Sequence, residues 1–397
     1  MTRKILAMFV AGMAFAGNVH AQVIKPEPDP ALNNPDKLSW ELFVQVTKPA
    51  ATTGNNNVLF ETWASDEDTF QQNPLFPGST SPPVCATGPA VEAAAPPPGG
   101  PGVQLAGASP KILKVPALQR LAPPRPGGQL EATVGGSEEV RRNQATFNFI
   151  YCNKLYRQAG LKAAFAAGKP ISFPTDSIEV KANWVPASSV EQLLYHVNTA
   201  SDGKQYALVS MHIISKLVPN WTWATFEHRN NAGRCDFIGC RDDFGAKMPL
   251  VKAHGTTGQQ YPACEKTDAL KAMFNAAGLP ALWQNYCLKG SQVDFTTATG
   301  VPTLLGNSVT ENGFVNTSSC MSCHSRASVL ASGEDAQGAG FIDPPVAALC
   351  PSGPNASCSP NGTPNPTWFW NNPGQPNQTM KAMQTDFIWA IPLAAVP

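Results

Sequence analysis

The sequence predicts an α+β fold: a mixed, antiparallel, β-rich body with flanking helices, followed by an irregular C-terminal region. Runs rich in β-branched and aromatic residues occupy the middle of the 397-residue chain, for example Gln205–Ser215 (QYALVSMHIIS). Apolar residues at helical spacing precede and follow these runs. The chain also contains 38 Pro and 32 Gly, so we expect much of it to form loops.

The first 21 residues have the features of an export signal. Arg3 and Lys4 form a positive end, residues 5–17 are apolar, and residues 18–21 (NVHA) end in the small residue that signal peptidase prefers. An apolar stretch of about a dozen residues is too short to cross a membrane. We predict cleavage after Ala21 and export to the periplasm; the alternative is a buried N-terminal helix. Later segments lack the roughly 18 unbroken apolar residues of a span, so we expect no membrane span in the mature chain.

Two segments precede the predicted body. Residues 22–76 are predicted to be an N-terminal helical segment, because apolar residues recur at helical spacing from Trp40 to Val46. Residues 77–137 are rich in Pro and Gly and can bury little apolar surface. We therefore expect them to form a flexible insertion.

The body is predicted to span residues 138–304 and to combine helices with an antiparallel sheet. Residues 138–166 and 268–277 show helical spacing of apolar residues, whereas 230–260 is loop-like. Strands are expected within residues 171–184, which alternate around 177–184 (SIEVKANW), and at Gln205–Ser215 and 221–226 (WTWATF). Residues 305–397 are predicted to form a separate C-terminal region, in which the Pro-, Asn- and Gly-rich residues 343–379 are expected to wrap the core as irregular chain.

Charge and cysteine content support an exported protein. Lys plus Arg equals Asp plus Glu at 28 each, which argues against nucleic acid as a partner, because such partners require a basic surface. Eight cysteines lie outside the motif described next, and an even number in an oxidising compartment predicts disulfides. Short loops favour Cys235–Cys240, Cys264–Cys287 and Cys350–Cys358, which leaves Cys85 for Cys152. The alternative is that these thiols are buried and unoxidised.

Residues 320–324 (CMSCH) form the most specific motif in the chain. Two cysteines three positions apart, followed at once by a histidine, are the haem c attachment pattern. Cys320 and Cys323 would each add to one vinyl group of the porphyrin, and His324 would bind the iron as proximal ligand. We therefore predict one covalent haem c. A dithiol redox pair gains nothing from His324, and a zinc site lacks a fourth ligand at a recognisable spacing.

Four segments carry a resemblance to a known family. They are residues 173–184 (FPTDSIEVKANW), 221–231 (WTWATFEHRNN), 319–325 (SCMSCHS) and 385–392 (TDFIWAIP). These segments resemble those of large bacterial periplasmic monohaem proteins of the cytochrome c family. The resemblance implies periplasmic location and one covalent haem, with no settled substrate.

The sixth ligand of the iron decides between electron transfer and catalysis. Met380, 56 residues after His324, is our first choice, and simple packing of that methionine is the alternative. His228 is the second choice, as a ligand or as a distal residue, because it stands beside Glu227 and Arg229. Single histidines elsewhere, such as His212, are expected to be structural.

Three functional hypotheses follow, from different classes. The preferred one is a periplasmic c-type cytochrome that passes single electrons to a periplasmic or membrane redox partner. The alternative is a monohaem oxidoreductase with an open iron site, peroxidase-like or acting on a small substrate; a third is a binding module with haem appended.

Asp236, Asp242 and Asp243 offer oxygen ligands for calcium, but a solvated acidic loop is the expected interpretation.

Overall fold

A computed structural model of the chain describes residues 32–50, 57–85, 137–168, 170–200, 203–312, 314–336 and 362–397. The predicted signal peptide and most of the predicted insertion lie outside these residues. Within them, helices and antiparallel sheets occur together, which confirms the α+β fold class. In these described parts of the chain no helix has the length and apolar character of a membrane span.

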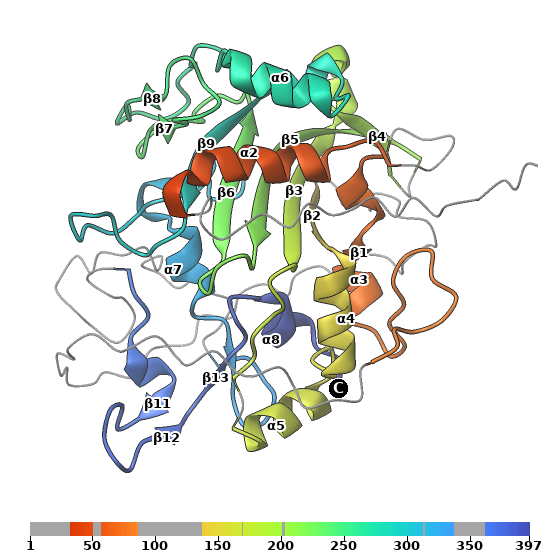
Figure 1. The fold of residues 1–397 in the computed structure, drawn as a ribbon, viewed down its shortest axis with the longest axis vertical. Helices are drawn as coiled ribbons and strands as arrows, with labels where there is room; N and C mark the ends of the chain where they lie inside the picture. The colour runs from red at the N-terminus through yellow and green to blue at the C-terminus, as the bar shows by residue number, and fades with distance from the viewer. Residues whose placement is uncertain are drawn as a thin grey trace, which may run out of the picture.

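A seven-stranded antiparallel sheet forms the upper half of the molecule (Figure 1). Its strand order is β1-β2-β3-β5-β6-β9, and β4 pairs with β5 outside this path. The strands predicted within 171–184, at Gln205–Ser215 and at 221–226 are β3, β5 and β6, so all three are confirmed, although the first begins only at Ile178. The bounds are β1 Ala64–Ser65, β2 Ser137–Arg142, β3 Ile178–Pro186, β4 Val197–Thr199, β5 Gln205–Ser215, β6 Thr222–His228 and β9 Tyr286–Gln292.

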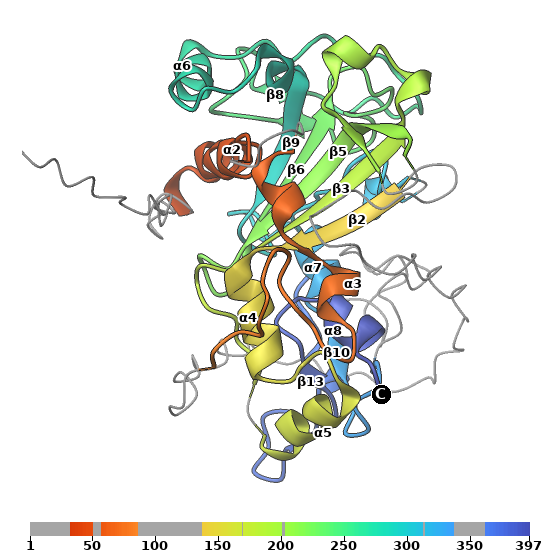
Figure 2. The same ribbon diagram turned by 90° about the vertical axis from the view of Figure 1, so that its right-hand side faces the viewer.

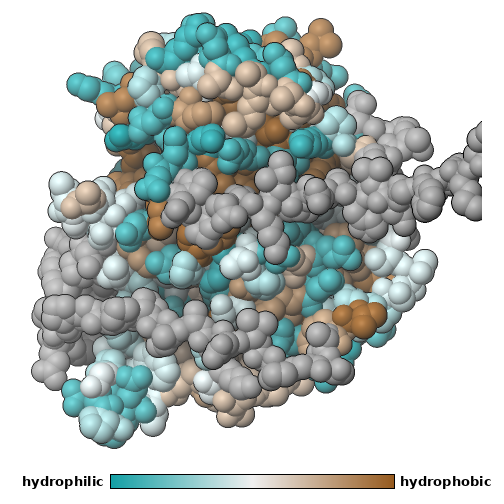
Figure 3. Space-filling view, in the orientation of Figure 1, coloured by the Kyte–Doolittle hydropathy of each residue, from teal (hydrophilic) through white to brown (hydrophobic). Residues whose placement is uncertain are grey.

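Helix α2 (Pro35–Val46) covers one face of this sheet, and α6 (Asp268–Ala276) packs against α2 (Figures 1 and 2). Asn34 caps α2 by accepting the Lys37 N–H at 3.1 Å, which satisfies one of the otherwise unpaired amides of the first turn. Trp40 lies on Phe226 of β6, with ring centroids 4.9 Å apart. The partly exposed residues of α2 include Lys37, Glu41 and Gln45, as expected for a helix with one buried side, and Figure 3 shows hydrophilic and apolar residues mixed over α6.

The opposite face of the sheet is polar, although it is largely buried. Side chains alternate along a strand, and Val180 and Ala182 of β3 belong to the core under α2. Lys181 and Asn183 therefore face the other way. His212 of β5 also lies on this polar face and is 8 % exposed, so polar groups here must find partners within the protein.

A second layer lies below the sheet in Figures 1 and 2. It contains α3 (Asp66–Thr69), α4 (Gln144–Cys152), α5 (Gln158–Ala166) and α8 (Ala390–Ala394). Its apolar core includes Ile150, Leu161, Met321 and Ile391. Helix α7 (Cys320–His324) lies between this layer and the sheet (Figure 2). Two short antiparallel ladders complete the region: β10 (Ser328–Val329) with β13 (Met383–Gln384), and β11 (Trp370–Asn371) with β12 (Thr379–Met380).

Two expectations about secondary structure were wrong. The start of the segment predicted as helical, 138–166, is strand β2, and the helices begin only at Gln144 and Gln158. Buried ion pairs explain the strand, because Arg142 reaches Glu179 of the neighbouring β3 at 3.1 Å. The segment 230–260 is also not entirely loop: β7 (Cys240–Arg241) pairs with β8 (Leu250–Val251).

Three of the four predicted disulfides are confirmed. Cys85–Cys152, Cys235–Cys240 and Cys264–Cys287 are all bonded. The fourth predicted pair, Cys350–Cys358, lies outside the described residues. Of the eight cysteines in the described residues, six are therefore oxidised, and Cys320 and Cys323 remain thiols.

Candidate covalent cofactor site

Helix α7 presents the three residues of the motif on one face. Cys320, Cys323 and His324 stand at positions i, i+3 and i+4, which lie side by side on a helix surface. All three are partly exposed, whereas Met321 and Ser322 are buried. The face that carries the thiols and the imidazole is therefore the accessible one.

Polar contacts attach the first turn of α7 to the sheet. The Gln292 side chain, at the end of β9, accepts the Met321 N–H at 3.2 Å and donates to the Ser319 hydroxyl at 3.1 Å. Leu305 forms a parallel bridge with Ser319. The orientation of the helix is thus set by residues far from the motif in the sequence.

One contact fixes the tautomer of His324. Its Nδ1 donates to the Phe387 carbonyl oxygen at 2.8 Å, and a carbonyl can only accept, so the proton is on Nδ1. The Trp223 ring packs against the imidazole with centroids 4.7 Å apart. Burial lowers the pKa of His324 to about 4, which keeps the ring neutral at pH 7. Nε2 is left with its lone pair, as in metal-binding histidines.

A strained turn holds the carbonyl that His324 uses. Asp386 and Phe387 both have left-handed backbone conformations, with φ of 51° and 72°, which are unfavourable for side chains of this size. The Asp386 carboxylate receives the Lys216 ammonium at 2.6 Å and the Phe173 N–H at 2.7 Å. Such strain persists only where the surroundings enforce it, and here a buried ion pair does so.

A buried polar cluster lies beside the thiols on the polar face of the sheet. His212 Nδ1 contacts the Thr225 hydroxyl at 2.8 Å, and Nε2 lies 2.9 Å from Asn307 Nδ2 and 3.5 Å from a Glu311 oxygen. Burial raises the pKa of Cys320 well above its ordinary value, and the charge of Glu311 adds to this. Sequence analysis missed this cluster; polar residues at alternate positions of β3, β5 and β6 were the available signal.

Burial is also the main reason that the pKa of Cys323 rises, to about 11. Both cysteines are therefore protonated near pH 7.

Met380 lies in β12, is partly buried and packs on the apolar core of the second layer. Cys320 packs on the same core. Met380 and Cys320 thus belong to one apolar cluster, but β12 lies at the bottom of Figure 1 and α7 lies higher, beside the sheet. Met383, three residues later, is buried in that core.

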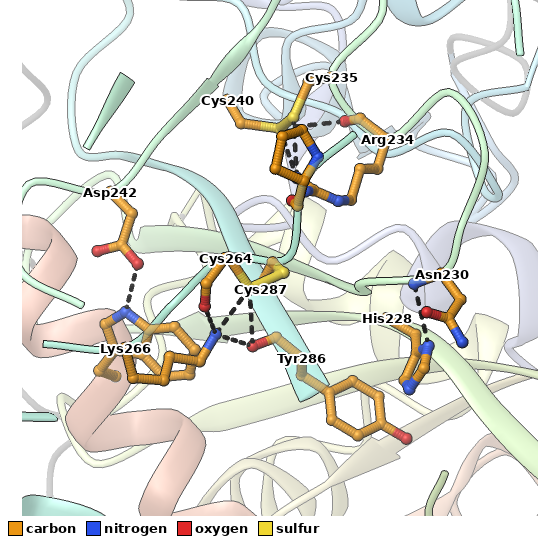
Figure 4. Close-up of a disulfide and its surroundings, with 12 residues drawn as sticks. His228, Asn230, Arg234, Cys235, Cys240, Asp242, Cys264, Lys266, Tyr286 and Cys287 are labelled. Atoms are coloured by element: carbon orange, nitrogen blue, oxygen red, sulfur yellow. Dashed lines mark hydrogen bonds between the residues drawn. A yellow bond between two sulfur atoms is a disulfide. The ribbon is translucent and has the colours of Figure 1, made fainter. Parts of the chain in front are cut away.

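His228 is not brought to the motif. Its Nε2 donates to the Leu194 carbonyl at 3.1 Å and its Nδ1 accepts the Asn230 N–H at 3.2 Å, so both nitrogens are in use. It packs against Tyr286 (Figure 4). Trp223, which contacts His324, is five residues away along β6, roughly 16 Å in a strand. We therefore do not retain His228 as a ligand or distal residue.

We expected a solvated acidic loop near Cys235, and this prediction was wrong, because two of its three acidic residues are buried. Asp236 and Asp242 are each 3 % exposed. Asp236 accepts the Tyr261 hydroxyl at 2.5 Å and Asp242 accepts the Trp40 N–H at 3.0 Å. Only Asp243 of the three is exposed. Among the described residues, no three His, Cys, Asp or Glu side chains are grouped to hold a metal ion by themselves.

Comparisons with known protein families, with curated proteins and with solved structures found no match to this chain. The chemistry of the site is therefore inferred from its own residues. Two thiols and a neutral imidazole with an available Nε2 share one accessible face. This donor set fits a porphyrin that is bound covalently at one edge and ligated at its iron from one side.

Proposed function

We propose that Cys320 and Cys323 carry one haem c through thioether bonds and that His324 is its proximal ligand. The main support for this proposal is the hydrogen bond from His324 Nδ1 to the Phe387 carbonyl. This bond occupies Nδ1 and leaves the lone pair of Nε2 for the iron. The bound haem would supply an iron that cycles between ferrous and ferric states. Trp223 and Phe387 would hold the imidazole in place.

We further propose that the protein is a periplasmic c-type cytochrome that transfers single electrons to a periplasmic or membrane redox partner. The signal-like residues 1–21 and the three disulfides support export to an oxidising compartment. Met380 is the proposed sixth ligand. Ligation by Met380 would favour electron transfer, because a thioether as second axial ligand occupies the position that a substrate would need.

The His212–Glu311 pair favours a second candidate, a monohaem oxidoreductase with an open iron site. An imidazole and a carboxylate 3.5 Å apart beside the motif are groups suited to proton transfer. Such a pair would serve a peroxidase-like reaction or the oxidation of a small substrate.

Attachment is tested on the protein purified from the periplasm, by intact mass and by haem staining after denaturation and acid extraction. Haem should remain attached in the parent and in a His254→Ala control, which changes an exposed histidine. Cys320→Ala and Cys323→Ala should lose stable attachment. His324→Ala should keep the haem but alter its absorption spectrum. A parent chain without added tetrapyrrole mass would reject the proposal.

Carbon monoxide separates the two candidate functions. A low-spin ferrous spectrum that carbon monoxide leaves unchanged supports the electron carrier. Met380→Ala should then convert the protein to a form that binds carbon monoxide. Prompt binding by the parent protein would instead support the oxidoreductase.

A further inference from the structure

The Cys235–Cys240 disulfide lies against a buried arginine. Arg234 Nη1 donates to Cys235 Sγ at 3.1 Å and lies 3.8 Å from Cys240 Sγ (Figure 4). Arg234 is 2 % exposed, and in the described residues no carboxylate forms an ion pair with it. Its other hydrogen bond is to the Pro262 carbonyl. The two disulfide sulfurs thus lie in contact with the guanidinium, and the Glu227 carboxylate acts on its charge from further away.

The two sulfurs differ in their surroundings. Cys235 is fully buried, whereas Cys240 is 8 % exposed and lines a small cavity of about 30 Å³ together with Arg234, Met248 and Pro262. Cys240 is thus the less buried of the two cysteines. Cys235 is the sulfur whose departing thiolate would be stabilised by the guanidinium.

The loop closed by this disulfide is short, because only five positions separate the two cysteines. Phe237 and Gly239, between the two cysteines, both have left-handed backbone conformations, with φ of 63° and 73°. The loop lies outside the central sheet, in the β7–β8 region (Figure 1). By contrast, Cys287 is in β9 of the sheet, so opening the Cys264–Cys287 bond would disturb the core.

In the Cys264–Cys287 disulfide, the Lys266 side chain lies against one sulfur, but it also forms hydrogen bonds with backbone carbonyls. Lys266 Nζ lies 2.7 Å from Cys264 Sγ and also donates to the backbone carbonyls of Cys264 and Tyr286, at 3.0 and 2.6 Å (Figure 4). An ammonium that holds two carbonyls is needed in the folded structure whether the disulfide is present or not.

We propose that Cys235–Cys240 is a redox-active disulfide that exchanges with a dithiol. A thiolate of the dithiol attacks Cys240 Sγ, the Cys235–Cys240 bond breaks, and Cys235 leaves as a thiolate beside Arg234. The second thiol of the dithiol then attacks the mixed disulfide and releases Cys240. Two electrons and two protons pass from the dithiol to the protein, and the dithiol becomes a disulfide. This activity is independent of the proposed haem.

The test is an anaerobic redox titration of the folded, full-length exported protein with reduced and oxidised dithiothreitol. The samples are quenched with an alkylating agent and digested with trypsin, which places Cys235 and Cys240 together in residues 235–241. We expect this pair to be half reduced at a dithiol-to-disulfide ratio about tenfold or more below that of Cys264–Cys287. If Cys264–Cys287 or Cys85–Cys152 is reduced first, the proposal is overturned.

Two variants test the part played by Arg234. Arg234→Gln should raise the dithiol ratio needed for half reduction by about tenfold or more, because the leaving thiolate loses its cation. Arg234→Lys keeps the charge and should retain most of the effect; it also decides the question if the glutamine variant does not fold. An unchanged ratio in Arg234→Gln, or a ratio in Arg234→Lys as high as that of Cys264–Cys287, would refute the role of the charge.

Discussion

Replacing Asp386 by Asn tests whether a buried ion pair supports the turn that holds His324. The Lys216–Asp386 pair is 2.6 Å long, with side chains 8 % and 7 % exposed. Asparagine tolerates the left-handed backbone at this position and can still accept the Phe173 N–H, so the main loss is the negative charge. Lys216 would remain buried with only the Pro219 carbonyl as a hydrogen-bond partner among the described residues.

The expected cost follows from that uncompensated charge. Removing one partner of a buried pair costs about 3–5 kcal/mol of unfolding free energy. Asp243→Asn is the matched control, because the Arg241–Asp243 pair has nearly the same length, 2.7 Å, but its side chains are 70 % and 52 % exposed. Exposed pairs contribute at most about 1 kcal/mol. Burial is therefore the main difference between the two ion pairs.

Urea unfolding followed by tryptophan fluorescence measures both variants. We expect Asp386→Asn to lower the unfolding midpoint strongly and Asp243→Asn to leave it almost unchanged. The double variant Lys216→Met with Asp386→Asn should lose less stability than Asp386→Asn alone, because it buries no unpaired charge. Equal losses in the two single variants would show that burial of the pair has no such effect.

Two further predictions concern residues away from the motif. Burial lowers the pKa of His228 from 6.5 to about 4, so the unfolded chain binds a proton that the folded chain does not. The free energy of unfolding should therefore fall by about 3 kcal/mol as the pH drops from about 6.5 to about 4. Urea unfolding measured across this pH range should show no such fall in His228→Gln. The exposed-site control, His254→Gln, should show the same fall as the parent protein. Gly245→Ala would place a Cβ 2.1 Å from Trp40 Nε1 and should lower the free energy of unfolding by about 1–3 kcal/mol. The control, Gly255→Ala, meets nothing within 4 Å and should leave the thermal midpoint unchanged. Similar midpoints for the two glycine variants would contradict the predicted clash.

The strands of the sheet could be predicted where burial and composition agree. Gln205–Ser215 is β5 without any change of bounds, because its β-branched and aromatic residues fit a buried pleated surface. Strand β2 was not predictable in the same way. Its sequence, SEEVRR, is mostly charged, and it is a strand only because its buried side chains find ion partners such as Glu179 on neighbouring elements. Sequence periodicity cannot show such pairing.

The motif was predictable because its chemistry is local, whereas its support is not. Five consecutive residues carry the thiols and the imidazole, and the short-loop disulfides were predictable for the same reason. The polar cluster around His212 joins β5 to β6 and to residues 307–311. A histidine in an apolar strand gives no sign of those partners until the fold brings them together.

Three segments from distant parts of the sequence converge on α7. Phe173 donates its N–H to Asp386, Trp223 packs on His324, and Phe387 accepts the His324 N–H from 63 residues further along the chain. A five-residue motif alone leaves an imidazole able to rotate and to change tautomer. The three converging segments remove both freedoms, and this is a property of the whole fold.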